Sequence, residues 1–339
     1  MNVKVEFSGP VQYRIRSMAV ACKATAEVLL RRRRQGPRLP TWNVFVELTT
    51  QMMKAQLTEA FNLHDVRKAR LYLDSMVINW PVLSEVTITP LAGEEFKGSW
   101  FVPRAGDTRA TLLYLHGGGY AFCPKSYRNL IAHITVHAKT RTFALDYRLA
   151  PEHRFPAQLE DTLNAYRFLL EDTGPGDLIV AGDSAGAHLT LGLLLKARDA
   201  GLPLPVLAIA ISPPTDFDAG RAAMSKNAEF DFIDPYMLQE WSRWFCDPER
   251  YRDPPLCFKN ADLRGLPPIY IQAGGLEILY DSIRAFAENA RARGADVTLE
   301  TWHDMPHDFQ LFGEHAPQSA AALKRIAEVI ESHTGVRSR

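Results

Sequence analysis

A serine flanked by small residues lies where a nucleophile could be presented. The pentapeptide Gly182–Gly186, which reads Gly-Asp-Ser-Ala-Gly, directly follows an apolar run at Leu178–Ala181 and opens a helical pattern. Small residues beside the serine permit a sharp turn between strand and helix that exposes its hydroxyl group. Such a serine can also serve as a helix N-cap. The position between strand and helix nevertheless favours covalent chemistry at Ser184.

A run of glycines upstream could stabilise developing negative charge. The segment His116–Tyr120, which reads His-Gly-Gly-Gly-Tyr, ends another apolar run at Thr111–Leu115. Successive glycines let backbone N–H groups point inward without a Cβ in the way, so the loop could hold an oxyanion together with the N–H of Ala185. A phosphate cradle is the alternative, but the GxGxxG and Walker A spacings are both absent.

A serine nucleophile needs a histidine base and an acid that orients it. In a fold that presents the serine on a turn between strand and helix, both follow the serine in the chain, the acid first. His303, His307 and His315 follow the last expected strand. His307 lies in a loop-like stretch between that strand and the final helix, so we predict that His307 is the base.

The acid should lie just past the strand expected at Pro268–Gln272. Glu277 comes a few residues after this strand, from where its carboxylate could reach the second imidazole nitrogen. Asp281 lies one helical turn further on, where a cap or a local ion pair is the expected role. We therefore predict Glu277 as the acid.

The elements that must position these groups begin at Ser84. From there, short β patterns alternate with longer helical ones, which is typical of a mostly parallel sheet covered by helices. We expect strands at Val86–Thr89, Lys97–Val102, Thr111–Leu115, Thr142–Asp146, Leu178–Ala181, Val206–Ile211, Pro268–Gln272 and Val297–Thr301. We expect helices at Tyr127–Lys139, Ala157–Glu171, Ala185–Ala200, Tyr280–Arg293 and Gln318–Ser332.

Two further segments do not belong to this alternation. The first 80 residues are helical in pattern, with helices expected at Met18–Leu30 and Phe45–Leu73. The basic run Arg31–Arg34 could let the first helix lie on an anionic membrane, or it could complement the dipole at the end of the helix. The aromatic-rich segment Pro213–Leu266 is too long for a plain loop, and we expect it to form part of a cap.

The composition limits the class of protein. The 339 residues carry no net charge, with 39 Lys+Arg and 39 Asp+Glu, which argues against a nucleic-acid partner. A hydrophobic content of 46% excludes disorder. The four cysteines form no CxxC pair and have no His-rich neighbourhood, so neither a disulfide framework nor a metal site is indicated. The chain shows no signal-peptide pattern and no apolar run of about 20 residues, so we expect a cytoplasmic protein.

Four stretches together resemble the hormone-sensitive-lipase-like family of α/β-hydrolases, the microbial carboxylesterases with an HGGG motif. They are His116–Tyr120, Asp146–His153, Gly182–Gly186 and the loop around His307. The resemblance implies an α/β-hydrolase fold, with a mostly parallel eight-stranded sheet flanked by helices and a helical cap. Residues 1–83 would form an N-terminal cap segment and residues 84–339 the catalytic domain, with residues 213–266 as a cap insertion.

The resemblance also implies the roles of the remaining residues. The oxyanion donors correspond to Gly118, Gly119 and Ala185, and no cofactor is needed. The family's acid usually lies in an Asp-Pro-Leu-x-Asp stretch, whereas this chain reads Glu-Ile-Leu-Tyr-Asp from Glu277. The acid is therefore Glu, as in a subset of relatives that includes lactone hydrolases. We regard the Asp146–His153 stretch as structural.

We therefore predict a serine carboxylesterase acting on a small-molecule acyl ester of short to medium chain length. Ser184, His307 and Glu277 would form the triad, and Tyr120 and Asp183 would line the substrate pocket. A lactone hydrolase and an amide or N-acetyl deacylase remain alternatives on the same machinery. A non-catalytic receptor is a further alternative, because plant gibberellin receptors resemble this family. Those receptors lack the working histidine, however, and the presence of His307 argues against this alternative. A homodimer also remains open.

Overall fold

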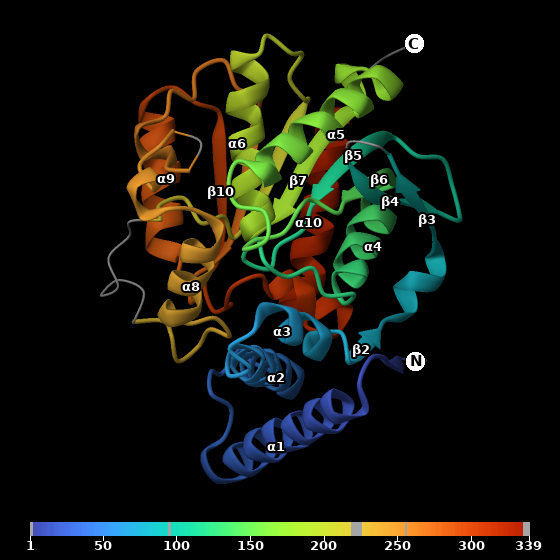
Figure 1. The fold of residues 1–339 in the computed structure, drawn as a ribbon, viewed down its shortest axis with the longest axis vertical. Coiled ribbons are helices and arrows are strands. Elements are labelled where there is room, and N and C mark those ends of the chain that lie inside the picture. Colours follow the sequence, from blue (N-terminus) through green and yellow to red (C-terminus); the bar gives the residue numbers. More distant parts are fainter. Residues whose placement is uncertain (1–2, 94–95, 218–225, 255, 335–339) are drawn as a thin grey trace.

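The computed structural model describes residues 3–93, 96–217, 226–254 and 256–334, and an eight-stranded sheet forms its centre (Figure 1). The strand order is β10-β9-β8-β7-β5-β6-β4-β3. β4 pairs antiparallel with both β3 and β6, and the other neighbours are parallel. The strands are β3 Val86–Ala92, β4 Lys97–Pro103, β5 Ala110–Leu115, β6 Thr140–Leu145, β7 Leu178–Asp183, β8 Leu207–Ile211, β9 Ile269–Gly274 and β10 Val297–Trp302. All eight strands predicted from the sequence are present, which confirms the α/β class.

Helices cover both faces of this sheet. With the helices that lie outside the sheet included, the described helices are α1 Val11–Gln35, α2 Val44–Phe61, α3 Val66–Leu73, α4 Tyr127–Ala138, α5 Ala157–Thr173, α6 Ala185–Asp199, α8 Pro235–Phe245, α9 Tyr280–Ala292 and α10 Pro317–Thr334. Short 3-10 helices are η1 Pro81–Glu85, η2 Pro175–Asp177, η3 Pro248–Arg250, η4 Phe258–Asn260 and η5 Phe309–His315. The five helices predicted after Ser84 are confirmed as α4, α5, α6, α9 and α10.

The central strands are apolar on both sides because each side faces helices. In β5, Leu112 and Tyr114 share a core with α4 and α10, whereas Leu113 and Leu115 share one with α5 and α6. Successive side chains of a strand point to opposite faces. A strand covered on both faces is therefore a continuous apolar run, as the sequence shows at Thr111–Leu115.

The N-terminal segment differs from its prediction in two respects. The single helix expected at Phe45–Leu73 is wrong, because α2 ends at Phe61 and α3 begins at Val66. Between them His64 has a positive φ of 50°, and the Asp65 side chain caps α3 by accepting the N–H of Lys68. A second, two-stranded antiparallel sheet, which was not predicted, joins β1 Lys4–Phe7 to β2 Met76–Asn79.

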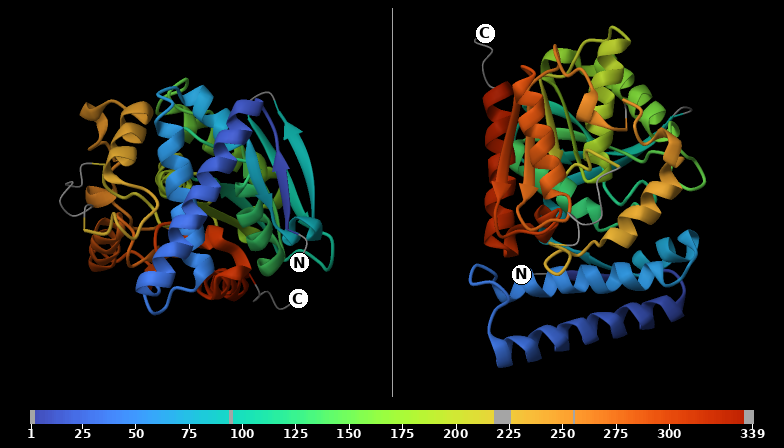
Figure 2. Two further views of the ribbon diagram at one scale, coloured as in Figure 1. Left: turned by 90° about the horizontal axis from the view of Figure 1, so that it is seen from below. Right: turned by 90° about the vertical axis from the view of Figure 1, so that its left-hand side faces the viewer.

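The helices α1 and α2 form a layer beneath the rest of the protein, with α1 outermost (Figure 2). Glu47 of α2 is buried, and its carboxylate pairs with the guanidinium groups of Arg31 and Arg32 on α1. Arg33 and Arg34 are exposed. Half of the basic run therefore holds α1 on α2.

The residue 213–266 segment contributes α8, which packs against α2. Phe61 of α2 stacks on Trp244 with ring centroids 5.5 Å apart and meets the edge of Trp241 at 5.4 Å. Trp241 in turn lies against Gly119, since a Cβ on that glycine would come within 2.3 Å of the indole ring. The two segments outside the alternating pattern thus meet beside the glycine loop.

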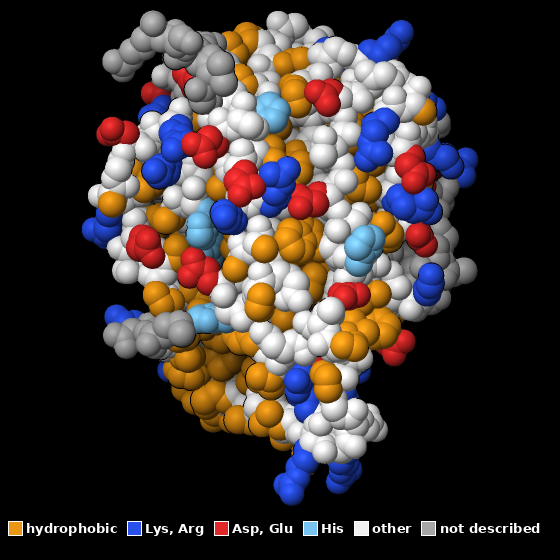
Figure 3. Space-filling model, turned by 180° about the vertical axis from the view of Figure 1, so that it is seen from behind, with side chains coloured by type: hydrophobic (Ala, Val, Ile, Leu, Met, Phe, Trp, Pro, Cys, Tyr) orange, Lys and Arg blue, Asp and Glu red, His pale blue; other side chains and the backbone are white. Residues whose placement is uncertain are grey.

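The outer surface of α1 is partly apolar. Hydrophobic side chains gather at the lower end of the molecule, where α1 lies (Figure 3), and Val11, Ile15 and Leu29 are each at least half exposed. None of the helices in the described part of the chain combines the length and the apolar character needed to cross a membrane. All four cysteines are free thiols.

Candidate active site

Ser184 lies at the turn between β7 and α6 in a strained backbone conformation. Its φ is 48° and its ψ is −118°, outside the regions that non-glycine residues normally occupy. A Cβ on Gly186 would come within 1.9 Å of the Leu115 carbonyl oxygen, and one on Gly182 within 2.5 Å of Gly186. Only glycine at both positions lets this turn pack against the end of β5. The surrounding packing holds Ser184 in this strained conformation, where it is partly exposed, as a nucleophile must be.

The glycine loop follows β5 and runs beside Ser184. Gly118 and Gly119 have positive φ values of 94° and 60°, and Tyr120 follows at 62°. Tyr147 holds the start of the loop by donating its hydroxyl hydrogen to the His116 carbonyl oxygen at 2.8 Å. This contact supports a structural role for the Asp146–His153 stretch.

His116 has a structural position rather than a catalytic one. Its ring stacks on Tyr147 with centroids 4.2 Å apart, and its Nδ1 lies 2.7 Å from the Gly117 carbonyl oxygen. Burial lowers the pKa of His116 to about 4, which keeps the ring neutral.

The N-terminal segment is also tied to this loop. Arg70 of α3 donates to the carbonyl oxygens of Ala121 at 2.7 Å and Ala150 at 2.8 Å. The same guanidinium contacts both carboxylate oxygens of Glu152 at 2.9 Å. These hydrogen bonds hold the pKa of Glu152 down at about 2. The sequence pattern gave no sign of this link, because Arg70 is far from its partners in the chain.

The His307 side chain contacts the Ser184 hydroxyl group. Its Nε2 lies 3.0 Å from the Ser184 Oγ, although 123 residues separate the two in the chain. His303 is exposed, and His315 packs against Trp80 with ring centroids 4.5 Å apart. Of the three histidines considered from the sequence, the structure therefore brings His307 to the serine.

Glu277 lies behind His307 and is fully buried. Its Oε2 is 3.7 Å from the His307 Nδ1, which is an ion-pair contact longer than a hydrogen bond. Burial raises the pKa of Glu277 to about 7, against the opposing effect of His307. Asp281 is exposed and pairs locally with Arg284 at 3.9 Å.

Ser212 is a contributor that the sequence analysis missed. Its hydroxyl donates to the Glu277 Oε2 at 2.6 Å and accepts the backbone N–H of Asp308 at 3.2 Å. It follows β8 directly, with a positive φ of 49°. A polar residue just past a buried strand is the signal that could have indicated it.

Asp231 is a second missed residue, from the segment before α8. Its fully buried carboxylate accepts the backbone N–H groups of Ile278 at 2.8 Å and His307 at 3.2 Å. It therefore joins the loops that carry Glu277 and His307. Lys54 of α2 holds the same segment by donating to the Asp231 carbonyl oxygen at 3.0 Å. Burial raises the pKa of Asp231 to about 6.

Two more buried carboxylates, those of Asp308 and Asp183, belong to residues next to His307 and Ser184 in the chain. The Asp308 Oδ2 is 3.2 Å from the His307 Nε2. Asp183 is fully buried and accepts the Tyr114 hydroxyl at 2.7 Å. Burial and the nearby Asp308 charge raise the pKa of Asp183 well above its ordinary value. The expectation that Asp183 lines the substrate pocket is wrong, because its side chain points into the core under the turn.

A cavity of about 400 Å³ opens at Ser184. Its wall includes Gly119, Tyr120 and Ala185 from the body and Leu238 and Trp241 from α8. The Tyr120 ring stacks on Phe245 with centroids 3.6 Å apart, which fixes this wall. Of the two residues expected at the pocket, Tyr120 lines it.

Comparisons with known proteins show to which family this chain is similar. Residues 112–311 match the family described as alpha/beta hydrolase fold. An acetyl-hydrolase of Streptomyces hygroscopicus is 38% identical over 70% of this chain and 80% of its own length. An esterase of Acinetobacter venetianus is 28% identical over 84% of this chain and 95% of its own length.

Solved structures of esterases and lipases are also similar to this chain. An esterase from the bacterial hormone-sensitive lipase family has a TM-score of 0.73 at 30% identity, covering 94% of this chain and 99% of its own. A hormone-sensitive lipase from a metagenome library has a TM-score of 0.74 at 31% identity, covering 83% of this chain and 97% of its own.

Proposed function

Because this chain belongs to the hormone-sensitive-lipase-like family of α/β-hydrolases and is a carboxylic ester hydrolase, we propose that it cleaves short- to medium-chain acyl esters through a Ser184-His307-Glu277 triad. The contact of 3.0 Å between the Ser184 Oγ and the His307 Nε2 carries this proposal. A serine hydroxyl is a weak nucleophile unless a neighbouring base accepts its proton.

In the proposed reaction, the Ser184 Oγ attacks the ester carbonyl carbon and its proton passes to the His307 Nε2. The carbonyl oxygen becomes an oxyanion, which accepts hydrogen bonds from the backbone N–H groups of Gly118, Gly119 and Ala185. Glu277 stabilises the imidazolium. The C–O bond to the alcohol then breaks, and His307 returns the proton to the departing alkoxide oxygen.

Water completes the cycle. His307 accepts a proton from a water molecule, whose oxygen attacks the acyl carbon on Ser184 through a second oxyanion intermediate. The bond to the Ser184 Oγ breaks, that oxygen recovers the proton, and the carboxylic acid leaves. Apart from the ester and water, the proposed steps use side chains and backbone groups of this chain.

We also propose that the described parts of residues 1–83 and 213–266, which are residues 3–83, 213–217, 226–254 and 256–266, form the cap over the cavity. The contacts of Phe61 with Trp241 and Trp244, and of Arg70 with Ala121, support this assignment. A volume of about 400 Å³ is near the small end of ligand pockets, which range over about 300–1,000 Å³. The size and the apolar wall at Leu238 support a short to medium acyl chain.

The test is hydrolysis of p-nitrophenyl esters from acetate to palmitate by the wild type and by Ser184→Ala. We expect serine-dependent activity that is highest with short and medium chains. Parallel assays with a lactone and an N-acetyl amine separate the alternatives on the same machinery. A folded wild type that turns over none of these substrates would refute the proposal and support a non-catalytic receptor.

A further inference from the structure

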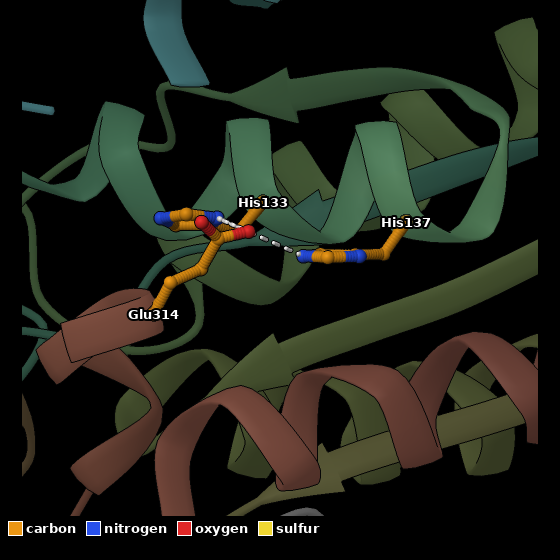
Figure 4. A group of neighbouring side chains, drawn as sticks. All are labelled: His133, His137 and Glu314. Atoms are coloured by element: carbon orange, nitrogen blue, oxygen red, sulfur yellow. Dashed lines mark ion pairs between the residues drawn. The ribbon is translucent and has the colours of Figure 1, made fainter. Parts of the chain in front are cut away.

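A cluster of metal-ligating side chains lies between α4 and η5, outside the site described above. His133 and His137 are one helical turn apart on α4, and Glu314 reaches them from η5 (Figure 4). One donor atom from each residue lies within 4.8 Å of the other two. Two histidines at positions i and i+4 place both rings on the same face of a helix, which is a known arrangement for holding zinc.

The distances are close to those of a metal centre. The Glu314 Oε1 lies 3.2 Å from the His137 Nε2 and 3.9 Å from the His133 Nδ1. A tetrahedral zinc ion with bonds of about 2.0–2.1 Å keeps its ligand atoms about 3.4 Å apart. Glu314 is exposed, and the His137 side chain is about a third exposed. Small rotations of these two side chains would bring all three donors within bonding distance of one ion.

His133 has a buried polar atom without a hydrogen-bond partner. Its side chain is 95% buried, yet its Nδ1 makes no hydrogen bond. A buried polar atom without a partner is unfavourable. A Cβ on Gly313 would lie 3.2 Å from the Nε2 of the same ring, so the η5 backbone limits how far the ring can turn away. Figure 4 shows the free Nδ1 directed toward Glu314.

We propose that His133, His137 and Glu314 bind a zinc-type divalent ion, with water at the fourth position. Two imidazoles and one carboxylate form a donor set that zinc accepts, whereas magnesium and calcium prefer oxygen ligands.

The ion would tie two elements that flank the active site. α4 follows the glycine loop, and η5 begins directly after Asp308, next to His307. Binding to the folded state alone would raise the thermal stability of the protein. This inference does not depend on the proposed ester hydrolysis, because its readouts are metal binding and thermal unfolding.

The binding test uses the full-length protein without a histidine tag, stripped with chelator and titrated with ZnCl₂ in a calorimeter. We expect one zinc ion per wild-type chain. His137→Ala and Glu314→Gln should each weaken binding by at least about tenfold, since even the loss of an outer-shell partner often costs that much. Both side chains are exposed enough for the variants to fold. His153→Ala removes an exposed histidine on the loop before α5 and should bind zinc as the wild type does.

Thermal unfolding provides the second measurement. Saturating zinc should raise the Tm of the wild type and of His153→Ala but not that of His137→Ala, and magnesium should raise none of them. The proposal is overturned if the wild type binds no zinc, or if His137→Ala and Glu314→Gln bind it as tightly as the wild type. An unchanged Tm in zinc-loaded wild type would also overturn the tie between α4 and η5.

Discussion

Replacing Asp308 by asparagine should move the acidic limb of the pH–rate profile to lower pH. Burial disfavours a charged His307, but the Asp308 and Glu277 carboxylates outweigh it and raise the pKa of His307 well above its ordinary value. The imidazole must be neutral to accept the proton of Ser184. Removing the Asp308 charge destabilises the imidazolium, lowers the pKa of His307, and leaves more of the base available in acid.

The size of this shift follows from the distance between the two groups. Unit charges 3.2 Å apart at an effective dielectric constant of 20 interact by about 5 kcal/mol. Burial and the nearby Asp308 charge raise the pKa of Asp183 well above its ordinary value, so the carboxylates of this cluster also repel one another. We therefore expect a downward shift of at least about one pKa unit, at the lower end of the usual effect of a nearby charge.

The assay is kcat/KM for p-nitrophenyl butyrate against pH, read at the isosbestic wavelength of the product. Asparagine tolerates the left-handed conformation that Asp308 adopts at a φ of 43°, so Asp308→Asn should fold. Asp281→Asn removes an exposed carboxylate at the start of α9 and is the matched control. An acidic limb that stays in place or moves to higher pH in Asp308→Asn would refute the reasoning.

Three other predictions concern the triad acid, the glycine loop and the N-terminal helices. Glu277→Gln keeps the shape of the buried side chain but removes its charge, so ester hydrolysis should fall by about 10²- to 10⁴-fold; activity within a few-fold of wild type would assign the acid elsewhere. Gly119→Ala places a Cβ 2.3 Å from the Trp241 ring at a φ of 60°, and kcat should fall by about 10²–10³ as the oxyanion donors shift; an unchanged kcat would show that this loop is not needed. Glu47→Ala leaves two half-buried guanidinium groups without their shared carboxylate and should lower the free energy of unfolding by about 2 kcal/mol. The exposed Arg34→Ala should change it by less than about 0.5 kcal/mol in the same denaturant titration, and equal effects of these two variants would contradict the structural role of the ion pairs.

The sequence by itself determined the features that depend on neighbouring residues. The apolar runs predicted the central strands β5, β7, β8 and β9, because a strand buried on both faces must be apolar along its whole length. The small residues around Ser184 predicted a sharp turn, and in the structure a Cβ on Gly182 or Gly186 would clash with its neighbours. The glycines after β5 predicted a loop whose N–H groups can point inward, and Gly118 and Gly119 have the positive φ values that glycine adopts readily. Chain order then indicated His307, which the structure places against the serine.

Only the tertiary structure decided which distant side chains meet. Ser212 and Asp231 reach the loops of Glu277 and His307 from other parts of the chain. The group His133, His137 and Glu314, which we propose as a zinc site, was not predicted from the sequence. The cysteine spacing gives no sign of it, and Glu314 joins the two histidines only in the fold. Asp183 was misplaced because residue type cannot tell which side of a turn a side chain faces. Turns and strands follow from local sterics and periodicity, whereas these contacts exist only once the chain has closed loops of tens to hundreds of residues.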